Sequence, residues 1–384
     1  MVQAIRRGQS IRTVALDFHV SKTTVERWIQ RTNGKRLDRV DWSDRPDGSP
    51  ASINRCAAEV ETCVLEIRQD LKEKSTLGEY GADAILREME RQQCPMTPSR
   101  ATINRILKRH GELDGRHRRR YLPPPPGWYL KPLAKGIVEL DQFDFIEDLC
   151  IQGGAMLQVL NGISLHGKLV GSWPMSRMTS ENTVRKLVEH WREYGLPDYA
   201  QFDNSTVFQG SRWPDSLGKV IRCCLSLDVI PVFAPPKETG FQAAVESFNG
   251  RWERSVWQRF HFENLRAVQS QSQLYIEAVN EKNDERLVAS PIRWQIPKDW
   301  QLDYAQRPQG KVIFIRRTTD EECLDVMGHR WHVKGAGSHK LVRAEVDLTK
   351  NRILFYRLRR REPNVHEFLG IAKYHFSNKP FKEN

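Results

Sequence analysis

The sequence lacks the features that mark secreted and membrane proteins. Its 384 residues include seven cysteines, with no Cys-x-x-Cys pair and no histidine spacing typical of a zinc site. An odd number of cysteines favours reduced thiols over a disulfide framework. No apolar run approaches the length of a membrane-spanning helix, and the charged N-terminus contains no signal-peptide core. These absences predict a soluble protein of the cytoplasm with no membrane partner.

Charge is unevenly distributed along the chain, which is long enough for several domains. The net charge is +12 and the isoelectric point about 9.4, values that favour a polyanionic partner. Residues 1–134 contain 25 Lys and Arg against 17 Asp and Glu, and residues 311–384 contain 16 against 9. Residues 135–310 contain 19 against 22. Two basic flanks around an acidic centre suit DNA-binding ends and a metal-dependent middle, and suggest association with the nucleoid.

A helix-turn-helix pattern occupies Ser10–Arg31. Val14 and Ala15 recur at helical spacing, and Ser21 is a favourable N-cap for a second helix. The outward side chains of that second helix are candidates for binding in the major groove of DNA: Lys22, Thr23, Thr24 and Arg27. The alternative is an ordinary helical hairpin, in which outward Lys and Arg side chains need no partner.

A second helical region follows a linker rich in Pro, Gly, Ser and Asp. Helices are predicted over about Ala57–Lys74, Gly81–Arg91 and Pro98–His110. We interpret them as a second DNA-binding unit, with a purely structural bundle as the alternative. A basic arm comes next, whose candidate phosphate contacts are Arg118, Arg119 and Arg120, although charge runs are often simply solvated. The proline run of Leu122–Trp128 then forms a stiff spacer.

The segment Gly136–Asp148 alternates as a β-strand requires. Leu140, Gln142 and Asp144 share one face, while Asp141 lies on the other. Apolar residues occur on both faces, which indicates a strand covered on both sides. The two aspartates therefore lie where charge is normally excluded, and a divalent metal ion is one means of stabilising them. The alternative is a frayed edge strand whose acids face water.

Two later segments supply further carboxylates. Asp203 ends a short apolar stretch, and Glu246 lies on a helix that follows a loop containing proline and glycine. One aspartate within a strand, one at a strand end and one helical glutamate could form a cluster that holds two Mg²⁺ ions, with Mn²⁺ able to substitute. Asp144, Asp203 and Glu246 are thus both the catalytic and the metal-binding candidates.

In these segments the chain resembles the DDE transposases and retroviral-type integrases, particularly insertion-sequence transposases with an integrase-core domain. The matching residues are Asp144 in DQFDFIED, Asp203 in QFDNSTVF and Glu246 in AAVESFNGRW. The 58 residues between the first two acids suit the family, whereas the 42 between the second pair are more than usual there. Ile146 and Ser205 stand where many relatives have Thr and Gly.

The resemblance implies a multidomain α+β protein with N-terminal helix-turn-helix units, a ribonuclease H-like α/β catalytic core and a C-terminal small β-barrel. The expected divisions are a helix-turn-helix unit at 1–40, a linker at 41–56, the second helical unit with its basic arm at 57–120, a proline-rich linker at 121–134, the integrase core at 135–290, a connector at 291–310, the barrel at 311–360 and a tail at 361–384. Val365–Tyr374 in the tail is predicted to be helical.

The implied function is metal-dependent cleavage of DNA ends and strand transfer of a mobile element. DNA ends and target would be the partners, with a homo-oligomer assembled on DNA and an ATPase as target-selection partner. Asn249 and Arg251, within two turns of Glu246, are further candidates for DNA contacts, whereas Trp252 suits core packing. The rivals are a non-cutting DNA-binding regulator or domesticated transposase, and a nuclease without strand transfer.

Asp141 competes with Asp144 for the role of first metal ligand. The two are three residues apart, so in a regular strand they face opposite sides and cannot serve one site. Asp144 has the more apolar surroundings and is the preferred candidate. A bulge near Gln142 and Phe143 would reverse that choice.

Overall fold

A computed structural model describes residues 1–43, 56–113, 125–210, 213–238, 240–360, 362 and 365–376. The chain divides into two compact units, an N-terminal unit of Met1–Glu59 and a C-terminal unit of Val60–Asn384. The predicted arm residues Arg118, Arg119 and Arg120 and most of the linker at 41–56 lie outside the described residues. None of the helices in the described ranges combines the length and apolar character that crossing a bilayer requires.

The N-terminal unit consists of three short helices, α1 (Val2–Arg6), α2 (Ile11–Asp17) and α3 (Lys22–Thr32), followed by the single turn η1 (Leu37–Arg39). Val14 and Ala15 of α2 pack against Val25 of α3. The hydroxyl of Ser21 accepts a hydrogen bond from the Thr24 backbone N–H at 3.1 Å and so caps α3, as the sequence predicts.

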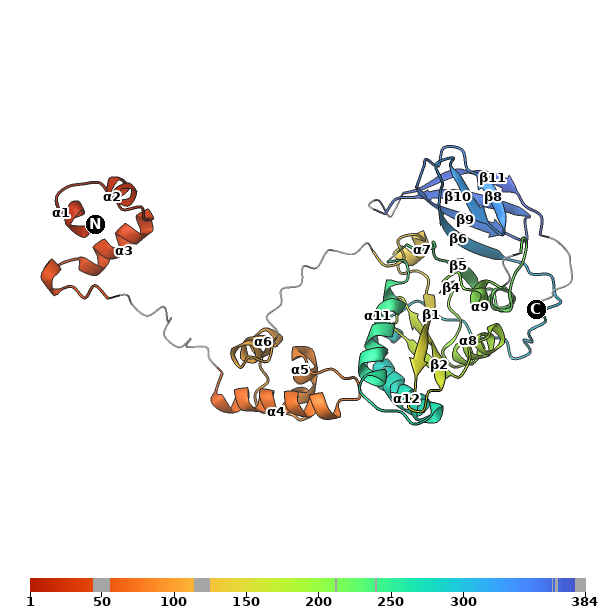
Figure 1. Cartoon of the computed structure of the whole chain (residues 1–384), viewed down its shortest axis with the longest axis horizontal. Helices are drawn as coiled ribbons and strands as arrows, with labels where there is room; N and C mark the ends of the chain where they lie inside the picture. The colour runs from red at the N-terminus through yellow and green to blue at the C-terminus, as the bar shows by residue number, and fades with distance from the viewer. Residues whose placement is uncertain are drawn as a thin grey trace. The chain divides into compact units, whose positions relative to one another are not determined.

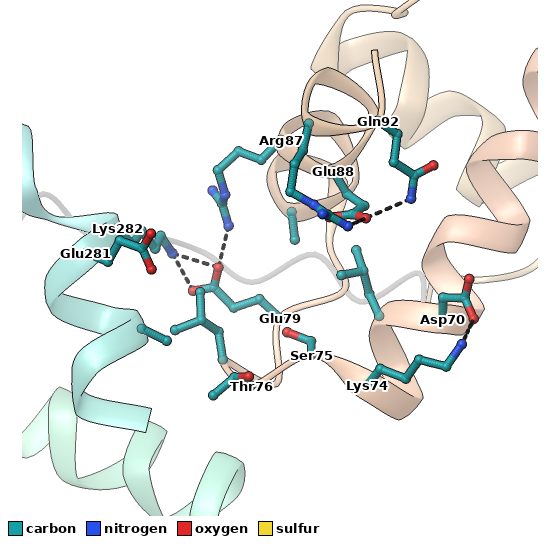
Figure 2. Close-up of a pocket in the computed structure, with 15 residues that line it drawn as sticks. Asp70, Lys74, Ser75, Thr76, Glu79, Arg87, Glu88, Gln92, Glu281 and Lys282 are labelled. Atoms are coloured by element: carbon teal, nitrogen blue, oxygen red, sulfur yellow. Dashed lines mark hydrogen bonds and ion pairs between the residues drawn. The ribbon is translucent and has the colours of Figure 1, made fainter. Parts of the chain in front are cut away.

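The predicted second helical region forms the start of the C-terminal unit: α4 (Ala58–Lys74), α5 (Ala82–Arg91) and α6 (Arg100–Arg109). Polar contacts join it to the rest of this unit. The Arg259 guanidinium donates to the last carbonyls of α4, including that of Glu73 at 2.7 Å, and so caps that helix. Glu79 accepts from both Arg87 and Lys282 along the edge of a cavity of about 650 Å³ (Figure 2).

The core begins with the short helix α7 (Lys131–Ala134) and continues with three strands, then helix, strand, helix, strand and helix, apart from the short helix α9. Its elements are β1 (Leu140–Cys150), β2 (Met156–Ser164), β3 (Val170–Met175), α8 (Ser180–Tyr194), β4 (Tyr199–Phe202), α9 (Thr206–Gln209), α10 (Lys219–Ser226), β5 (Ile230–Phe233), α11 (Ala243–Trp252), η2 (Glu253–Trp257), α12 (Leu265–Lys282) and α13 (Asp284–Val288). β1 pairs antiparallel with β2 and parallel with β4, which places it inside the sheet.

Both faces of β1 are covered, as its apolar pattern predicts. Figure 1 shows α11 and α12 on one side of β1 and β2 and α8 on the other. Ile146 packs with Val245 and Trp252 of α11, whereas Phe143 packs with Trp191 of α8. Trp252 is fully buried and donates from Nε1 to Ser272 at 2.9 Å, which confirms its predicted packing role.

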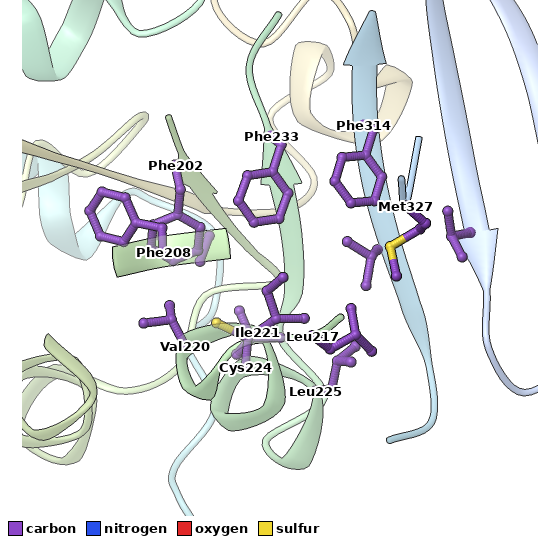
Figure 3. Close-up of a cluster of buried hydrophobic side chains, with 14 of the residues drawn as sticks. Phe202, Phe208, Leu217, Val220, Ile221, Cys224, Leu225, Phe233, Phe314 and Met327 are labelled. Carbon is purple, nitrogen blue, oxygen red and sulfur yellow. The ribbon is translucent and has the colours of Figure 1, made fainter. Parts of the chain in front are cut away.

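The C-terminal strands extend the core sheet, so the expected separate β-barrel is not confirmed. They are β6 (Lys311–Arg317), β7 (Cys323–Val326), β8 (His329–His332), β9 (Leu341–Asp347), β10 (Arg352–Leu358) and β11 (His366–Lys373). β6 pairs with β5, and the nine-stranded order is β11-β10-β9-β6-β5-β4-β1-β2-β3, with β7 and β8 forming a separate pair. Phe314 of β6 stacks on Phe233 of β5 at 5.1 Å within one apolar cluster (Figure 3). Shared apolar packing therefore joins the two regions.

The prediction of a helix over Val365–Tyr374 is wrong. His366–Lys373 forms β11, which pairs antiparallel with β10 from Leu358 to Arg352. The ladder contains an irregularity between Phe355 and Tyr356. Backbone pairing with a strand already in place satisfies the N–H and C=O groups of this segment, and that tertiary context overrides a local helical pattern.

Gly162 tests the packing of β1 against β2. A Cβ atom there would lie 2.6 Å from Cε1 of the buried Phe143 ring, so Gly162→Ala should lower the free energy of unfolding by about 1–3 kcal/mol. Urea denaturation of the full chain measures this. Gly81→Ala is the control, because a methyl group there meets nothing within 4 Å and the backbone has φ −84°. Equal losses in the two variants would contradict the close contact.

Candidate active site

The candidate site is centred on Asp144, in the part of β1 that faces α11. The alternation of β1 puts Gln142 and Asp144 on this face, and both contact α11. The Gln142 side chain accepts from the Val245 N–H at 3.2 Å and donates to Gln201 of β4 at 2.7 Å. One amide thus joins β1, β4 and the start of α11, the three elements that carry the predicted acids.

Asp144 is held by a chain of two amides. The Asn249 side chain, on α11, donates to Oδ2 of Asp144 at 2.9 Å. The Asn161 side chain, opposite Asp144 on β2, donates to Oδ1 of Asn249 at 2.9 Å. Because Asn161 occupies the amide oxygen of Asn249, the amide nitrogen is directed at the carboxylate.

Asp203 and Glu246 come from the neighbouring elements. Asp203 follows the last residue of β4, and its Oδ1 accepts from the Ser205 N–H at 3.0 Å. The adjacent Asn204 is fixed by the Arg316 guanidinium at 2.8 Å. Glu246 lies in the first turn of α11 with an exposed side chain. The fold therefore brings a strand, a strand end and a helix start together.

The electrostatics of Asp144 show that the three acids share one environment. Burial and the negative charges of Asp203 and Glu246 together raise its pKa to about 6, against the hydrogen bonds from the Phe145 backbone and the Asn249 side chain. Within the described ranges, no three acid, histidine or cysteine side chains are close enough to hold a metal ion as they stand. The acids therefore interact through space without forming a closed ligand shell. Their all-oxygen donor set suits Mg²⁺ in its chemistry.

Asp141 lies on the opposite face of β1 and has a different role. It is 1% exposed, and the Arg293 guanidinium donates to its two oxygens at 2.9 and 2.7 Å. Trp191 Nε1 donates a third hydrogen bond at 3.0 Å. Burial alone would raise the pKa of Asp141, but Arg293 outweighs it and the net shift is downward. Asp141 is thus balanced within the fold, whereas Asp144 is not.

The remaining predicted DNA contacts divide into three groups. Lys22, Thr23 and Arg27 are exposed on α3, while Thr24 is half-buried and its hydroxyl bonds to Ser21. The prediction that Asn249 contacts DNA is corrected by its burial. Its side chain is only 9% exposed, and both its amide oxygen and its amide nitrogen form hydrogen bonds inside the protein. Arg251 is half-buried beside the Phe248 ring, and its buried Nε has no hydrogen-bond partner in the described structure.

Sequence reasoning missed three residues of this site. Arg293 lies in the predicted connector, Arg316 in a strand assigned to another domain, and Asn161 in the middle of an apolar strand. Asn161 carried a usable signal, since a polar amide in a buried strand needs a partner. The two arginines carried none, because their partners are distant in sequence.

No protein-family model matches the sequence, and no curated protein matches it. Solved structures do match. A chain of the simian T-cell lymphotropic virus intasome in complex with PP2A regulatory subunit B56 gamma is 12% identical with TM-score 0.33, over 75% of this chain and 98% of that one. The catalytic core domain of BIV integrase is 15% identical with TM-score 0.28, over 37% of this chain and 84% of that one. The structural likeness to retroviral integrases is thus weak.

The Asp141–Arg293 pair gives a stability prediction. Arg293→Ala leaves a buried carboxylate without its cation and should cost about 3–5 kcal/mol at neutral pH. Because the pKa of Asp141 is lowered in the folded state, its stabilisation is present above the unfolded value and is lost as the pH falls through the folded value. Chemical denaturation should therefore show the deficit shrinking in acid. Arg330→Ala, which breaks the exposed pair with Glu321, is the control and should cost far less, because solvent screens an exposed pair; an equal cost would contradict this assignment.

Asp144 should show the opposite pH dependence. Its folded pKa of about 6 lies above the ordinary 3.8, so its stabilising effect is present below the ordinary value and is lost as the pH rises through 6. With a chelator present, the free energy of unfolding of Asp144→Asn, relative to that of the wild type, should rise by about 3 kcal/mol between pH 4 and pH 7. Urea denaturation measures this difference. Glu147→Gln, an exposed acid on the same strand, controls for removal of one charge. A difference that does not change with pH would remove Asp144 from the shared acidic environment.

Proposed function

We propose that this chain is a DNA transposase or integrase of the DDE type, which cleaves the ends of a mobile element and transfers them to target DNA in a metal-dependent reaction. The observation that carries the proposal is Asp144, a carboxylate in a buried strand whose pKa is raised to about 6 by burial and by the charges of Asp203 and Glu246. A site that gathers negative charge without balancing it suits a divalent cation.

Asp144, Asp203 and Glu246 would hold two Mg²⁺ ions, with Mn²⁺ able to substitute. The bound ions would activate a water or 3′-hydroxyl and stabilise the leaving 3′-oxygen. The Asn249 amide donates to one oxygen of Asp144. The same hydrogen bond fixes the orientation of the carboxylate and therefore of its second oxygen. Gln142 sets the start of α11 relative to β1 and so positions Glu246. The exposed Glu246 side chain has the freedom to turn towards the other two acids.

The other parts of the proposal rest on charge and local structure. A ribonuclease H-like core is supported by the order of its elements and by the central position of β1. The helix-turn-helix assignment is supported by exposed Lys22 and Arg27 on α3. A homo-oligomer on DNA, an ATPase that selects the target, and a cytoplasmic, nucleoid-associated location are parts of the same proposal.

Acid-to-amide variants separate chemistry from binding. Asp203→Asn and Glu246→Gln should each reduce nicking and strand transfer by about a hundred- to a thousandfold, an electrostatic loss of the size typical of single catalytic donors, while retaining DNA binding. Gel assays on the element's end with Mg²⁺ measure both steps. Lys22→Ala combined with Arg27→Ala should weaken DNA binding. The double variant should keep the rise in melting temperature that Mg²⁺ bound at the three acids is expected to cause.

Three outcomes distinguish the candidates. Normal cutting by the acid variants would refute the catalytic assignment. Binding without cutting by the wild type, in Mg²⁺ and in Mn²⁺, would favour the non-cutting regulator. Cutting without joining, tested with a pre-cut end, would favour a nuclease.

A further inference from the structure

A second site lies beside α11, in a cavity of about 440 Å³. Its charged lining residues are Arg360 and a group of three cations: Lys168 in the turn between β2 and β3, Arg251 on α11 and Arg286 on α13. Its apolar wall includes Trp128 and Phe241, whose ring centres are 5.5 Å apart. Cations and aromatic rings gathered from separate elements are the lining that a phosphorylated aromatic ligand requires.

The three cations are not balanced by acids. In the described parts of the chain, neither Lys168, Arg251 nor Arg286 makes an ion pair. Burial lowers the pKa of Lys168, and the charges of Arg286 and Arg251 lower it further, against the nearby Glu139. Glu139 itself accepts hydrogen bonds from three backbone N–H groups, those of Leu140, His166 and Gly167. A cluster of like charges in a partly desolvated site is unfavourable unless an anion joins it.

The position of Lys168 is built into the fold. Its backbone has φ +58°, in the left-handed region that few side-chain-bearing residues adopt. Its carbonyl accepts from the Asn283 side chain at 3.2 Å. Two residues further on, the Asn280 side chain forms hydrogen bonds with both the N–H and the carbonyl of Val170. The turn is therefore fixed against the end of α12. Backbone strain held in place by such contacts is typical of functional positions.

Two buried donors in the lining residues have no partner. Trp128 is 2% exposed, and its Nε1, like the Nε of Arg251, has no hydrogen-bond acceptor in the described structure. An unsatisfied buried donor is unfavourable. Ligand oxygens in the cavity would provide the negative charge that its cations lack.

We propose that this cavity binds the phosphate of one unpaired nucleotide of a DNA strand, with the nucleotide's base or sugar against the aromatic wall. The proposal rests on the proposed function and names a subsite for its DNA. A cavity of about 440 Å³ is of the size that holds one small ligand, so it would take one nucleotide and not a base pair. Ala243, Ser247 and Arg251, spaced four residues apart, line the cavity on one side of α11. Gln142, which shares the α11 face of β1 with Asp144, also lines it, so the subsite lies beside the acids.

The test uses the full chain, a fluorescent ten-nucleotide oligo-dT and a chelator, so that no cutting occurs. Lys168→Gln combined with Arg286→Gln should weaken binding at least tenfold in 0.1 M salt. It should also reduce the slope of log affinity against log salt by about 0.7 for each phosphate that the variant no longer neutralises. The matched control is Arg185→Gln combined with Arg192→Gln, which removes two exposed cations from α8 and should change binding less than twofold.

The outcomes are separable from those for the acids. Equal binding by wild type and double variant, or an equal loss in the α8 control, would overturn the subsite whether or not the protein cuts DNA. Competition by dTMP or inorganic phosphate as strong as that by unlabelled oligo-dT would overturn the strand assignment in favour of a free-phosphate site. Arg286→Gln alone, a change on the surface, should show a smaller loss in the same direction if the double variant does not fold. No loss in that variant would also overturn the proposal.

Discussion

A strand buried on both faces must balance every charge that it carries, and the rest of this site depends on how β1 meets that constraint. Asp141 is balanced by Arg293, with two hydrogen bonds on a fully covered face. Asp144 instead accepts a side-chain hydrogen bond from the Asn249 amide, and no ion pair of Asp144 is found among the described residues. A buried carboxylate that meets further carboxylates instead of a cation costs free energy, and that cost is what a bound divalent ion would remove. The two faces of one strand thus separate an acid that is paired with a cation from one that is not.

The same constraint explains why the surrounding side chains are amides. Gln142 bonds to Gln201 and to the backbone of Val245, while Asn161 orients Asn249. Amides position a carboxylate without neutralising it, whereas an arginine would have lowered its pKa and competed with a metal ion. Such a set keeps negative charge available on the α11 face, and its bonds run between separate elements, so the geometry is tied to the sheet itself.

Charge of the opposite sign collects in the cavity beside α11. The turn that carries Lys168 is held by Asn283. Within the described residues, Lys168, Arg251 and Arg286 form no ion pair of the kind that Arg293 forms with Asp141. Unbalanced acids and unpaired cations therefore lie along the same helix. A polyanionic strand with metal ions at one phosphate and cations at another would satisfy both.

Local pattern was enough to predict several elements from the sequence. The helix-turn-helix pattern of Ser10–Arg31 forms two helices with Ser21 as the N-cap of the second, and the alternation of β1 correctly assigned Asp141 and Asp144 to different faces. These features depend on backbone geometry that repeats over a few residues, and so they can be read from neighbours in the chain.

Tertiary structure alone decided the partners. Arg293 reaches Asp141 across 152 residues, Asn249 turns inward to Asp144, and β6 joins β5 through Phe314 and Phe233. The tail forms a strand because β10 offers it a backbone ladder. Local periodicity predicts none of these contacts. Each contact depends on a partner that is distant in sequence and that pairs with a buried charge, bonds to an amide or covers an aromatic ring. The sequence therefore determined which residues carry charge in a buried strand, and the folded chain determined which of those charges is left unbalanced.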